Sequence, residues 1–165
     1  MTEIDNIIRT LGLKPHPEGG HYTEIYRSDE RIGADVLPPR YGGARAFGTA
    51  IYYLLGPDDK SAMHRITSDE IFHFYLGYPV EQLQLFEDGS HRIVEIGPDL
   101  LAGQRPQMVV PRGVWQGARV KPGGRFALLG TTVAPGFDFD DFEMGPRDAL
   151  VPMYPDVAEM ICELT

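Results

Sequence analysis

A histidine and a glutamate stand six residues apart in the segment HRITSDEIFHFYLG, residues 64–77. Imidazole and carboxylate groups can transfer protons near neutral pH, and both also bind borderline and hard metal ions. His64 and Glu70 are therefore the first candidates for catalytic or metal-binding residues. The alternative is a surface glutamate in a turn and a histidine at a strand end. His73 has the opposite strand parity from Glu70 and is expected to be a packed, hydrogen-bonded histidine.

A second group of residues that could bind a ligand lies in EGGHYTEIYR, residues 18–27. If the part after the two glycines is a strand, Tyr22, Glu24 and Tyr26 share one face. A carboxylate between two aromatic rings can hold a small polar molecule by stacking and hydrogen bonding. The alternative is an edge strand with a polar outer face.

The elements that position these residues are short. The chain has 165 residues, 19 of them glycine and 14 proline, without a period. Alternating apolar runs recur between turn signals every 8–12 residues or so, which is typical of antiparallel sandwiches and barrels. The sequence predicts one mainly β domain over residues 1–165, with its core at about 15–137.

Three local elements are expected from pattern alone. Residues 2–11 place apolar side chains at helical spacing, with Thr2 as N-cap and Gly12 at the end. The tail from Tyr154 shows a second helical face. Asp88-Gly89, between two alternating runs, predicts a hairpin turn. The polar, proline-rich segment 28–45 is long enough for a lid or for an excursion at a sheet edge.

Composition excludes several classes of partner. The formal net charge is −9 and no Lys/Arg cluster occurs, which argues against nucleic acid and anionic membrane surfaces. No apolar run is long enough to cross a bilayer, and the first residues do not resemble a secretory signal. The single cysteine, Cys162, excludes an internal disulfide and a CxxC zinc site. We expect a cytoplasmic protein.

The segment 64–77 resembles the first motif of the cupin superfamily, G-x5-H-x-H-x(3,4)-E-x6-G. Glu70 and Gly77 match its end, His64 falls on the first histidine, and Ile66 replaces the second. The second cupin motif is echoed by PRGVWQ, residues 111–116, where Gln116 takes the place of the histidine. Two of four metal-ligand positions are therefore kept.

The stretches 15–28, 64–77, 110–118 and 132–139 together resemble one cupin branch, a domain of unknown function with a yeast representative. This resemblance covers about residues 3–145. It implies a jelly-roll barrel with short terminal helices and a homodimer. It also implies an interior pocket for a small polar molecule. Distant relatives of the branch include germin-like proteins and sugar-nucleotide 3,5-epimerases.

The resemblance leaves three uses for the cavity. The leading one is small-molecule binding of unassigned activity, with isomerase- or epimerase-like chemistry on a sugar-type substrate if the protein is catalytic. In that case His64 would be the base, oriented by Glu70 or Asp69. The acid would then be one of four tyrosines: Tyr22, Tyr26, Tyr53 or Tyr75. A second use is a non-catalytic ligand-binding or storage module. A third is a weakly metal-dependent enzyme, in which His64, Glu70 and Gln116 hold a divalent metal.

Strand parity adds a wall to this cavity. Phe72 and Phe74 follow Glu70 on the same face and are expected to continue it inward. The predicted ligand-binding residues are thus Tyr22, Glu24, Phe72, Phe74 and Gln116.

We predict a homodimer, because the resemblance implies one and because exposed strand edges of a barrel are commonly covered by a partner. Light scattering at micromolar concentration should give about twice the mass of the 18.4 kDa chain. The mass of a single chain would contradict this prediction.

Overall fold

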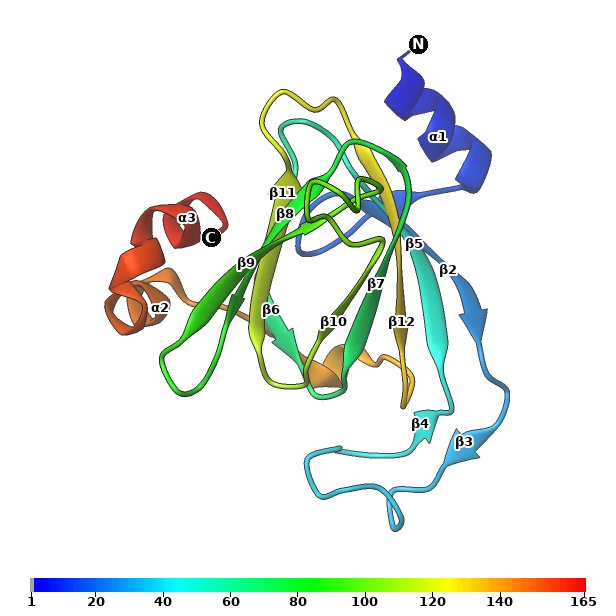
Figure 1. Cartoon of the computed structure of the whole chain (residues 1–165). Helices are drawn as coiled ribbons and strands as arrows, with labels where there is room; N and C mark the ends of the chain where they lie inside the picture. The colour runs from blue at the N-terminus through cyan, green and yellow to red at the C-terminus, as the bar shows by residue number, and fades with distance from the viewer. Residues whose placement is uncertain (1) are drawn as a thin grey trace.

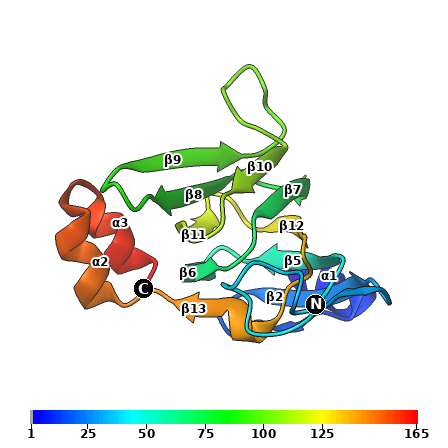
Figure 2. The ribbon, with the colours of Figure 1, turned by 90° about the horizontal axis from the view of Figure 1, so that it is seen from below.

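Two antiparallel sheets face each other in the computed structural model, which describes residues 2–165 (Figures 1 and 2). The first sheet contains, in spatial order, β1 (Lys14–Pro15), β2 (His21–Arg27), β5 (Thr49–Leu55), β12 (Ala127–Val133), β7 (Glu70–Gly77) and β10 (Gln107–Val110). The second contains β13 (Phe142–Met144), β6 (Lys60–Ile66), β11 (Trp115–Val120), β8 (Val80–Leu85) and β9 (His91–Ile96). The predicted mainly β, jelly-roll architecture is confirmed.

The core between the sheets comes from inward-facing side chains of both. Tyr53, Phe72 and Leu129 of the first sheet pack with Val80 and Ile96 of the second. Strand β12 is buried along almost all of its length, because it lies between β5 and β7. This central position explains its run of small and branched residues.

Helix α1 (Glu3–Leu11) forms where periodicity predicted it. Thr2 and Asp5 make a capping box, in which the Thr2 hydroxyl accepts the Asp5 N–H at 3.1 Å and the Asp5 carboxylate accepts the Thr2 N–H at 2.8 Å. Gly12 ends the helix with φ 64°. The apolar face of α1 packs on a small cluster that includes Leu54, Phe126 and Leu128.

The C-terminal segment is more helical than the sequence predicted. The expected helix is present as α3 (Ala158–Glu163), preceded by a short 3-10 turn, η2 (Pro155–Val157). A further helix, α2 (Arg147–Met153), begins after Pro146 and contains Pro152. The sequence did not predict it, because proline inside a segment normally argues against a helix. Both helices pack their apolar residues on the outer side of the second sheet (Figure 2). No helix within residues 2–165 is both long and apolar enough to span a membrane.

The predicted hairpin joins β8 and β9. Gly89, with φ 85°, donates its N–H to the Phe86 carbonyl at 3.0 Å, and the Phe86 N–H donates to the Ser90 carbonyl at 2.9 Å. Glycine supplies the positive φ that this short loop needs. The strands then pair in register from Val80 opposite Ile96 to Leu85 opposite His91.

The proline-rich segment is an excursion at the edge of the structure, carrying the small hairpin β3 (Arg31–Ile32) and β4 (Arg45–Ala46) (Figure 1). Its base is held by a buried ion pair in which Arg45 donates from Nε and Nη2 to the Asp141 carboxylate, each at 2.7 Å. Tyr41 adds a 2.8 Å hydrogen bond to Ser68. No residue of 28–46 lines the cavity described below.

A tight turn between β1 and β2 brings Glu18 inward. Gly19 (φ 109°) and Gly20 (φ 68°) have backbone conformations that favour glycine. A Cβ at Gly19 would collide with the Lys60 carbonyl oxygen, and one at Gly20 would lie 2.6 Å from the Leu54 carbonyl oxygen. The turn therefore packs directly on the backbones of β6 and β5.

We predict that Gly19→Ala lowers the free energy of unfolding by about 3 kcal/mol, since it adds a backbone collision to the strain of a positive φ. Gly103→Ala is the matched control, because Gly103 has φ 89° but open space around it. The control should lose only about 1 kcal/mol. Urea denaturation measures both, and equal losses would contradict the prediction.

Candidate functional site

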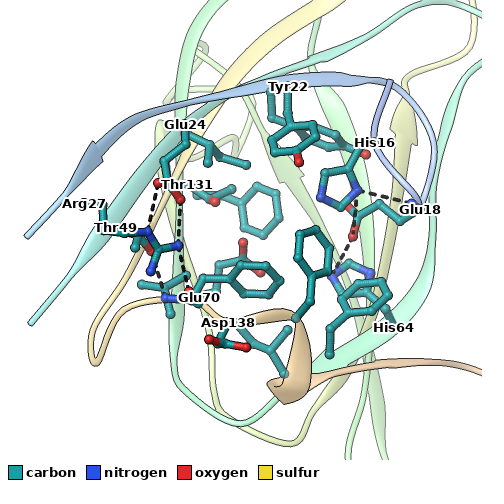
Figure 3. Close-up of a pocket in the computed structure, with 18 of the residues that line it drawn as sticks. His16, Glu18, Tyr22, Glu24, Arg27, Thr49, His64, Glu70, Thr131 and Asp138 are labelled. Atoms are coloured by element: carbon teal, nitrogen blue, oxygen red, sulfur yellow. Dashed lines mark hydrogen bonds and ion pairs between the residues drawn. The ribbon is translucent and has the colours of Figure 1, made fainter. Parts of the chain in front are cut away.

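A cavity of about 350 Å³ opens between the two sheets. It is walled by β2, β5, β7 and β12 on one side and by β6 and β13 on the other (Figure 3). Its polar and charged lining residues are Lys14, His16, Glu18, Tyr22, Glu24, Arg27, Thr49, Tyr53, His64, Glu70, Thr131 and Asp138. Its apolar lining residues are Ile51, Ile66, Phe72, Val133, Phe137, Phe139 and Phe142.

Glu18 and His64 form a buried pair at one end of the cavity. The Glu18 Oε1 accepts a hydrogen bond from the Ser61 hydroxyl at 2.7 Å, and its Oε2 lies 3.3 Å from Nε2 of His64. Glu18 is 8% exposed and His64 3%. A carboxylate withdrawn from water needs such partners. Sequence reasoning proposed His64 but missed its partner.

The surroundings of His64 fix the hydrogen on its ring. Its Nδ1 lies 2.8 Å from the Ala62 carbonyl oxygen, which can only accept, so Nδ1 carries the hydrogen. Nε2 is then the nitrogen that exchanges a proton, and it faces Glu18. The ring also stacks on Phe142, with centroids 5.3 Å apart.

The carboxylate that orients His64 is thus Glu18, and not Glu70 or Asp69 as the sequence suggested. Asp69 is turned elsewhere, because its Oδ1 accepts the Arg112 N–H at 2.8 Å. The six-residue spacing could not reveal Glu18, which reaches His64 from a different part of the chain.

His16 lies on the wall of the same cavity as a neutral side chain. Burial lowers the pKa of His16, the charge of Glu18 opposes this shift, and His64 adds to it. Its Nδ1 accepts the Glu18 N–H at 3.2 Å, so the neutral ring keeps its hydrogen on Nε2. The 3.8 Å approach of Nδ1 to the Glu18 carboxylate is therefore not an ion pair. His16 supplies a neutral N–H donor.

Glu70 is a buried carboxyl group with a shifted titration. Burial raises the pKa of Glu70, His64 lowers it, Glu18 raises it, and hydrogen bonds from Thr131 and Gln116 lower it. The Gln116 Nε2 donates to Glu70 Oε2 at 2.7 Å. Within residues 2–165, no ion pair to Glu70 is formed. A carboxyl group with a raised pKa can act as a general base near neutral pH.

The proposed metal ligands do not fit a metal as they are arranged. Gln116 presents its NH₂ group to Glu70, and its carbonyl oxygen accepts from Gln82 Nε2 at 3.3 Å. His64 Nε2 is engaged by Glu18. In the part of the chain that the structure describes, no three His, Cys, Asp or Glu side chains gather as a metal site. Gln116 lies behind Glu70 rather than on the cavity surface.

The mouth of the cavity is charged. Tyr22 and Glu24 both line it, as the shared strand face predicted. Arg27 donates to the two Glu24 oxygens at 2.9 and 2.8 Å and to the Phe137 carbonyl at 3.0 Å, so Glu24 is held by an ion pair (Figure 3). Lys14 Nζ lies 5.2 Å from the centre of the Tyr22 ring.

The aromatic wall differs in part from the expectation. Phe72 lines the cavity, whereas Phe74 packs against the core cluster beyond it. The pairing of β7 with β12 is regular from Phe72, opposite Thr131, to Phe74, opposite Leu129, so Phe74 keeps the inward face but lies farther along the strand than the cavity reaches. Phe137, Phe139 and Phe142, which follow β12 in the sequence, complete this wall.

The structure separates the four candidate tyrosines. Tyr26 is 55% exposed and Tyr75 is 50% exposed, and neither lines the cavity. Tyr53 does, but its hydroxyl donates to the Gly19 carbonyl at 2.8 Å and burial raises its pKa well above the usual value. Tyr22 is the candidate that lines the cavity without such a bond.

Sequence reasoning missed several lining residues, chiefly His16, Glu18, Arg27 and Asp138. The signal for Glu18 was available, because two consecutive glycines directly after a glutamate indicate a turn that approaches another backbone closely. Spacing could not identify Asp138, because only the tertiary fold brings the segment that follows β12 to the cavity.

A double-sheet antiparallel jelly roll is the architecture of cupins and of several other classes, and the family match assigns this chain to the cupins. The chain belongs to the family described as Cupin superfamily (DUF985), whose model matches residues 5–145. It is 30% identical over 150 residues to the uncharacterized protein YML079W of Saccharomyces cerevisiae, covering 85% of this chain and 74% of the yeast protein. The structure of protein SO0799 from Shewanella oneidensis is 35% identical, with a TM-score of 0.87 over 100% of this chain and 98% of that one.

Two more distant structures share the fold alone. A dTDP sugar isomerase from Desulfovibrio desulfuricans is 19% identical, with a TM-score of 0.55 over 81% of this chain and 88% of the isomerase. An oxalate decarboxylase variant from Bacillus subtilis is 13% identical, with a TM-score of 0.53 over 92% of this chain and 37% of the decarboxylase.

We predict that Glu70→Gln changes the pH dependence of stability. Because the pKa of Glu70 is raised above its usual value near 4.5, the folded chain binds this proton more tightly than the unfolded chain. The group's stabilising contribution is then full below about pH 4.5 and is lost as the pH rises through the folded pKa. Relative to the wild type, the variant should therefore gain stability as the pH rises above about 4.5 toward neutrality.

Urea denaturation at several pH values measures this difference. Glu159→Gln is the control, because Glu159 is exposed on α3. A Glu70→Gln curve that stays parallel to the wild type, as the control curve should, would contradict the prediction.

Proposed function

We propose that this cupin binds a small sugar-type molecule in the cavity and moves a proton on a carbon next to its carbonyl group, as an isomerase or epimerase. One observation carries the proposal. Glu70, a buried carboxyl group with a raised pKa, shares one cavity with the Glu18–His64 pair and the neutral donor His16. In this pocket burial raises the pKa of the Glu70 carboxyl group and lowers the pKa of the His16 imidazole. Pairs of titratable groups whose pKa values are shifted in opposite directions are common in acid–base catalysis.

Glu70 is the proposed base. Its carboxylate removes the proton from the carbon next to the carbonyl, and the electron pair moves onto the carbonyl oxygen as an enolate. Hydrogen bonds from Gln116 and Thr131 favour the ionised carboxylate, while burial keeps it basic. His64 takes a supporting role here, since its exchangeable nitrogen faces Glu18.

The enolate oxygen needs donors placed in advance. The Nε2–H of His16 is a neutral donor on the cavity wall, and His64, when protonated, adds positive charge at the same end. Such donors act strongly in a site shielded from water. The aromatic side chains Phe72, Phe139 and Phe142 supply that shielding.

Tyr22 is the proposed acid. It projects from β2, whereas Glu70 projects from β7, with β5 and β12 between these strands. A proton delivered by Tyr22 from the other face of the enolate inverts the carbon, and the proton held by Glu70 returns through solvent to Tyr22. Atoms and electrons balance without an oxidant or cofactor.

The charges of the cavity favour a neutral substrate. Four carboxylates (Glu18, Glu24, Glu70 and Asp138) face two permanent cations, Lys14 and Arg27. Arg27 is already paired with Glu24. A pyrophosphate group would meet excess negative charge here. The volume is also at the small end of ligand pockets, which span roughly 300–1,000 Å³. The name of the dTDP sugar isomerase therefore supports the class of reaction more than its nucleotide substrate.

A ligand-binding module without catalysis is the second candidate. It is favoured by the internal pairing of the cavity's polar groups: Glu18 with Ser61, Tyr53 with Gly19, and Arg27 with Glu24. Groups that are already satisfied can hold a ligand without activating it.

Proton NMR in D₂O tests the proposal with a panel of neutral aldoses and ketoses and one dTDP-linked keto sugar. A substrate should lose the signal of the hydrogen next to its carbonyl as deuterium enters. Glu70→Gln should slow this exchange by about 100-fold or more, as loss of a general base does. Tyr22→Phe should retain exchange but lose the epimerised product.

Tyr26→Phe is the matched control, because Tyr26 lies on the same strand outside the cavity. It should leave both signals unchanged. Thermal stabilisation by a sugar without any exchange would instead support the binding module. Exchange that persists in Glu70→Gln would overturn the assignment of the base.

A further inference from the structure

We propose that Arg92, Gln84, Gln82 and Gln116 form a directional hydrogen-bond chain, called here the glutamine chain, that holds Glu70 as a hydrogen-bond acceptor. These four are positioning residues and do not line the cavity. The catalytic meaning of the chain rests on the proposed function of Glu70, whereas its existence does not.

The glutamine chain runs through the second sheet to the cavity. Arg92 Nε on β9 donates to Gln84 Oε1 at 2.9 Å, and Gln84 Nε2 donates to Gln82 Oε1 at 2.7 Å. Gln82 Nε2 then donates to Gln116 Oε1 at 3.3 Å. The last link is the 2.7 Å bond from Gln116 Nε2 to Glu70 Oε2.

The strand register explains why these side chains meet. Gln82 and Gln84 are two residues apart on β8 and so share a face. Gln84 lies opposite Arg92 on β9 and opposite Gln116 on β11. The four residues of the glutamine chain therefore lie side by side on three neighbouring strands, β9, β8 and β11.

The positive end sets the direction of every amide. A guanidinium group only donates, so Gln84 must turn its oxygen to Arg92. Its NH₂ group then faces Gln82, and the same choice is passed on to Gln116. Gln116 consequently offers an N–H, and not a carbonyl oxygen, to Glu70. An ionised Glu70 carboxylate can accept this N–H hydrogen bond. If every amide were turned around, Gln116 would present its carbonyl oxygen, and Glu70 would have to be protonated to donate to it.

The burial of the amides argues that they have a role. Gln82 and Gln84 are 0% exposed and Gln116 is 1% exposed, so none of the three amides can rely on bulk water for its hydrogen bonds. Burying an amide is unfavourable unless its hydrogen bonds are made. Leu83 and Leu85, on the other face of β8, show the residues that packing alone selects there.

Other groups also act on Glu70. The titratable groups that interact with it are His64 on β6, Glu18 on the β1–β2 turn and Tyr53 on β5, and Thr131 on β12 adds a hydrogen bond. Burial and Glu18 favour the protonated acid, whereas His64 and Thr131 favour the carboxylate. The glutamine chain adds to the second side.

Carbon-13 NMR titration of the glutamate carboxyl groups tests the chain without a substrate. The Glu70 signal is assigned as the one missing from Glu70→Gln. In Arg92→Met the midpoint of the Glu70 titration should rise by about 1 pH unit, because Gln84 loses the donor that fixes its direction. Gln82→Leu, which cuts the chain in the middle, should give a similar rise, and Arg92→Lys, which can only donate, should restore most of the wild-type midpoint.

Arg119→Met is the matched control. It removes the same charge from the same sheet, but Arg119 pairs with Glu81 and Glu163 and takes no part in the chain. Its Glu70 midpoint should equal that of the wild type. An unchanged midpoint in Arg92→Met, or an equal rise in Arg119→Met, would overturn the proposal even if Gln82→Leu fails to fold. A raised midpoint in a protein without isomerase activity would leave the chain standing and remove only the proposed function.

Discussion

Two carboxylates buried between two sheets are the constraint on which this structure depends. Glu18 and Glu70 lie where most positions of a barrel are apolar, and each ionised form is unfavourable without compensation. The fold compensates them differently. The Glu18 carboxylate contacts the Ser61 hydroxyl through one oxygen and the His64 imidazole through the other, so both of its oxygens have polar partners. Glu70 accepts hydrogen bonds only from neutral protein groups, so its carboxyl group can take up and release a proton.

The backbone around the site follows from the same requirement. Glu18 reaches His64 only because the turn at Gly19 and Gly20 lies directly on the strands below it. The Glu18 carbonyl also accepts the Ala62 N–H at 2.8 Å, so one residue joins the first sheet to the second through both backbone and side chain. On the far side, the Arg45–Asp141 pair secures the segment that carries Phe139 and Phe142. The cavity thus has rigid supports at both ends.

Local patterns were sufficient for most of the elements, with α2 as an exception, and insufficient for the site. The α1 helix and the Gly89 hairpin are decided by residues within a few positions of each other, so periodicity and turn chemistry predicted them. The convergence of His64 and Glu70 was predicted through a motif. The partner of His64 was not, because Glu18 precedes it by 46 positions and no local pattern connects the two. Gln116 lies beside Glu70, but it does not line the cavity as predicted, and only its neighbours reveal that its NH₂ group faces Glu70.

These long sequence separations also bear on how the pocket forms in time. The contacts that support it join residues 43, 46 and 96 positions apart, and each such closure costs chain entropy before any contact stabilises it. The hairpin β8–β9 and helix α1 need no such closure. We therefore expect the pocket to be completed later than the local hairpin and helix. A molecule that binds the completed pocket, and not the unfolded chain, would stabilise the native state in proportion to the logarithm of its concentration.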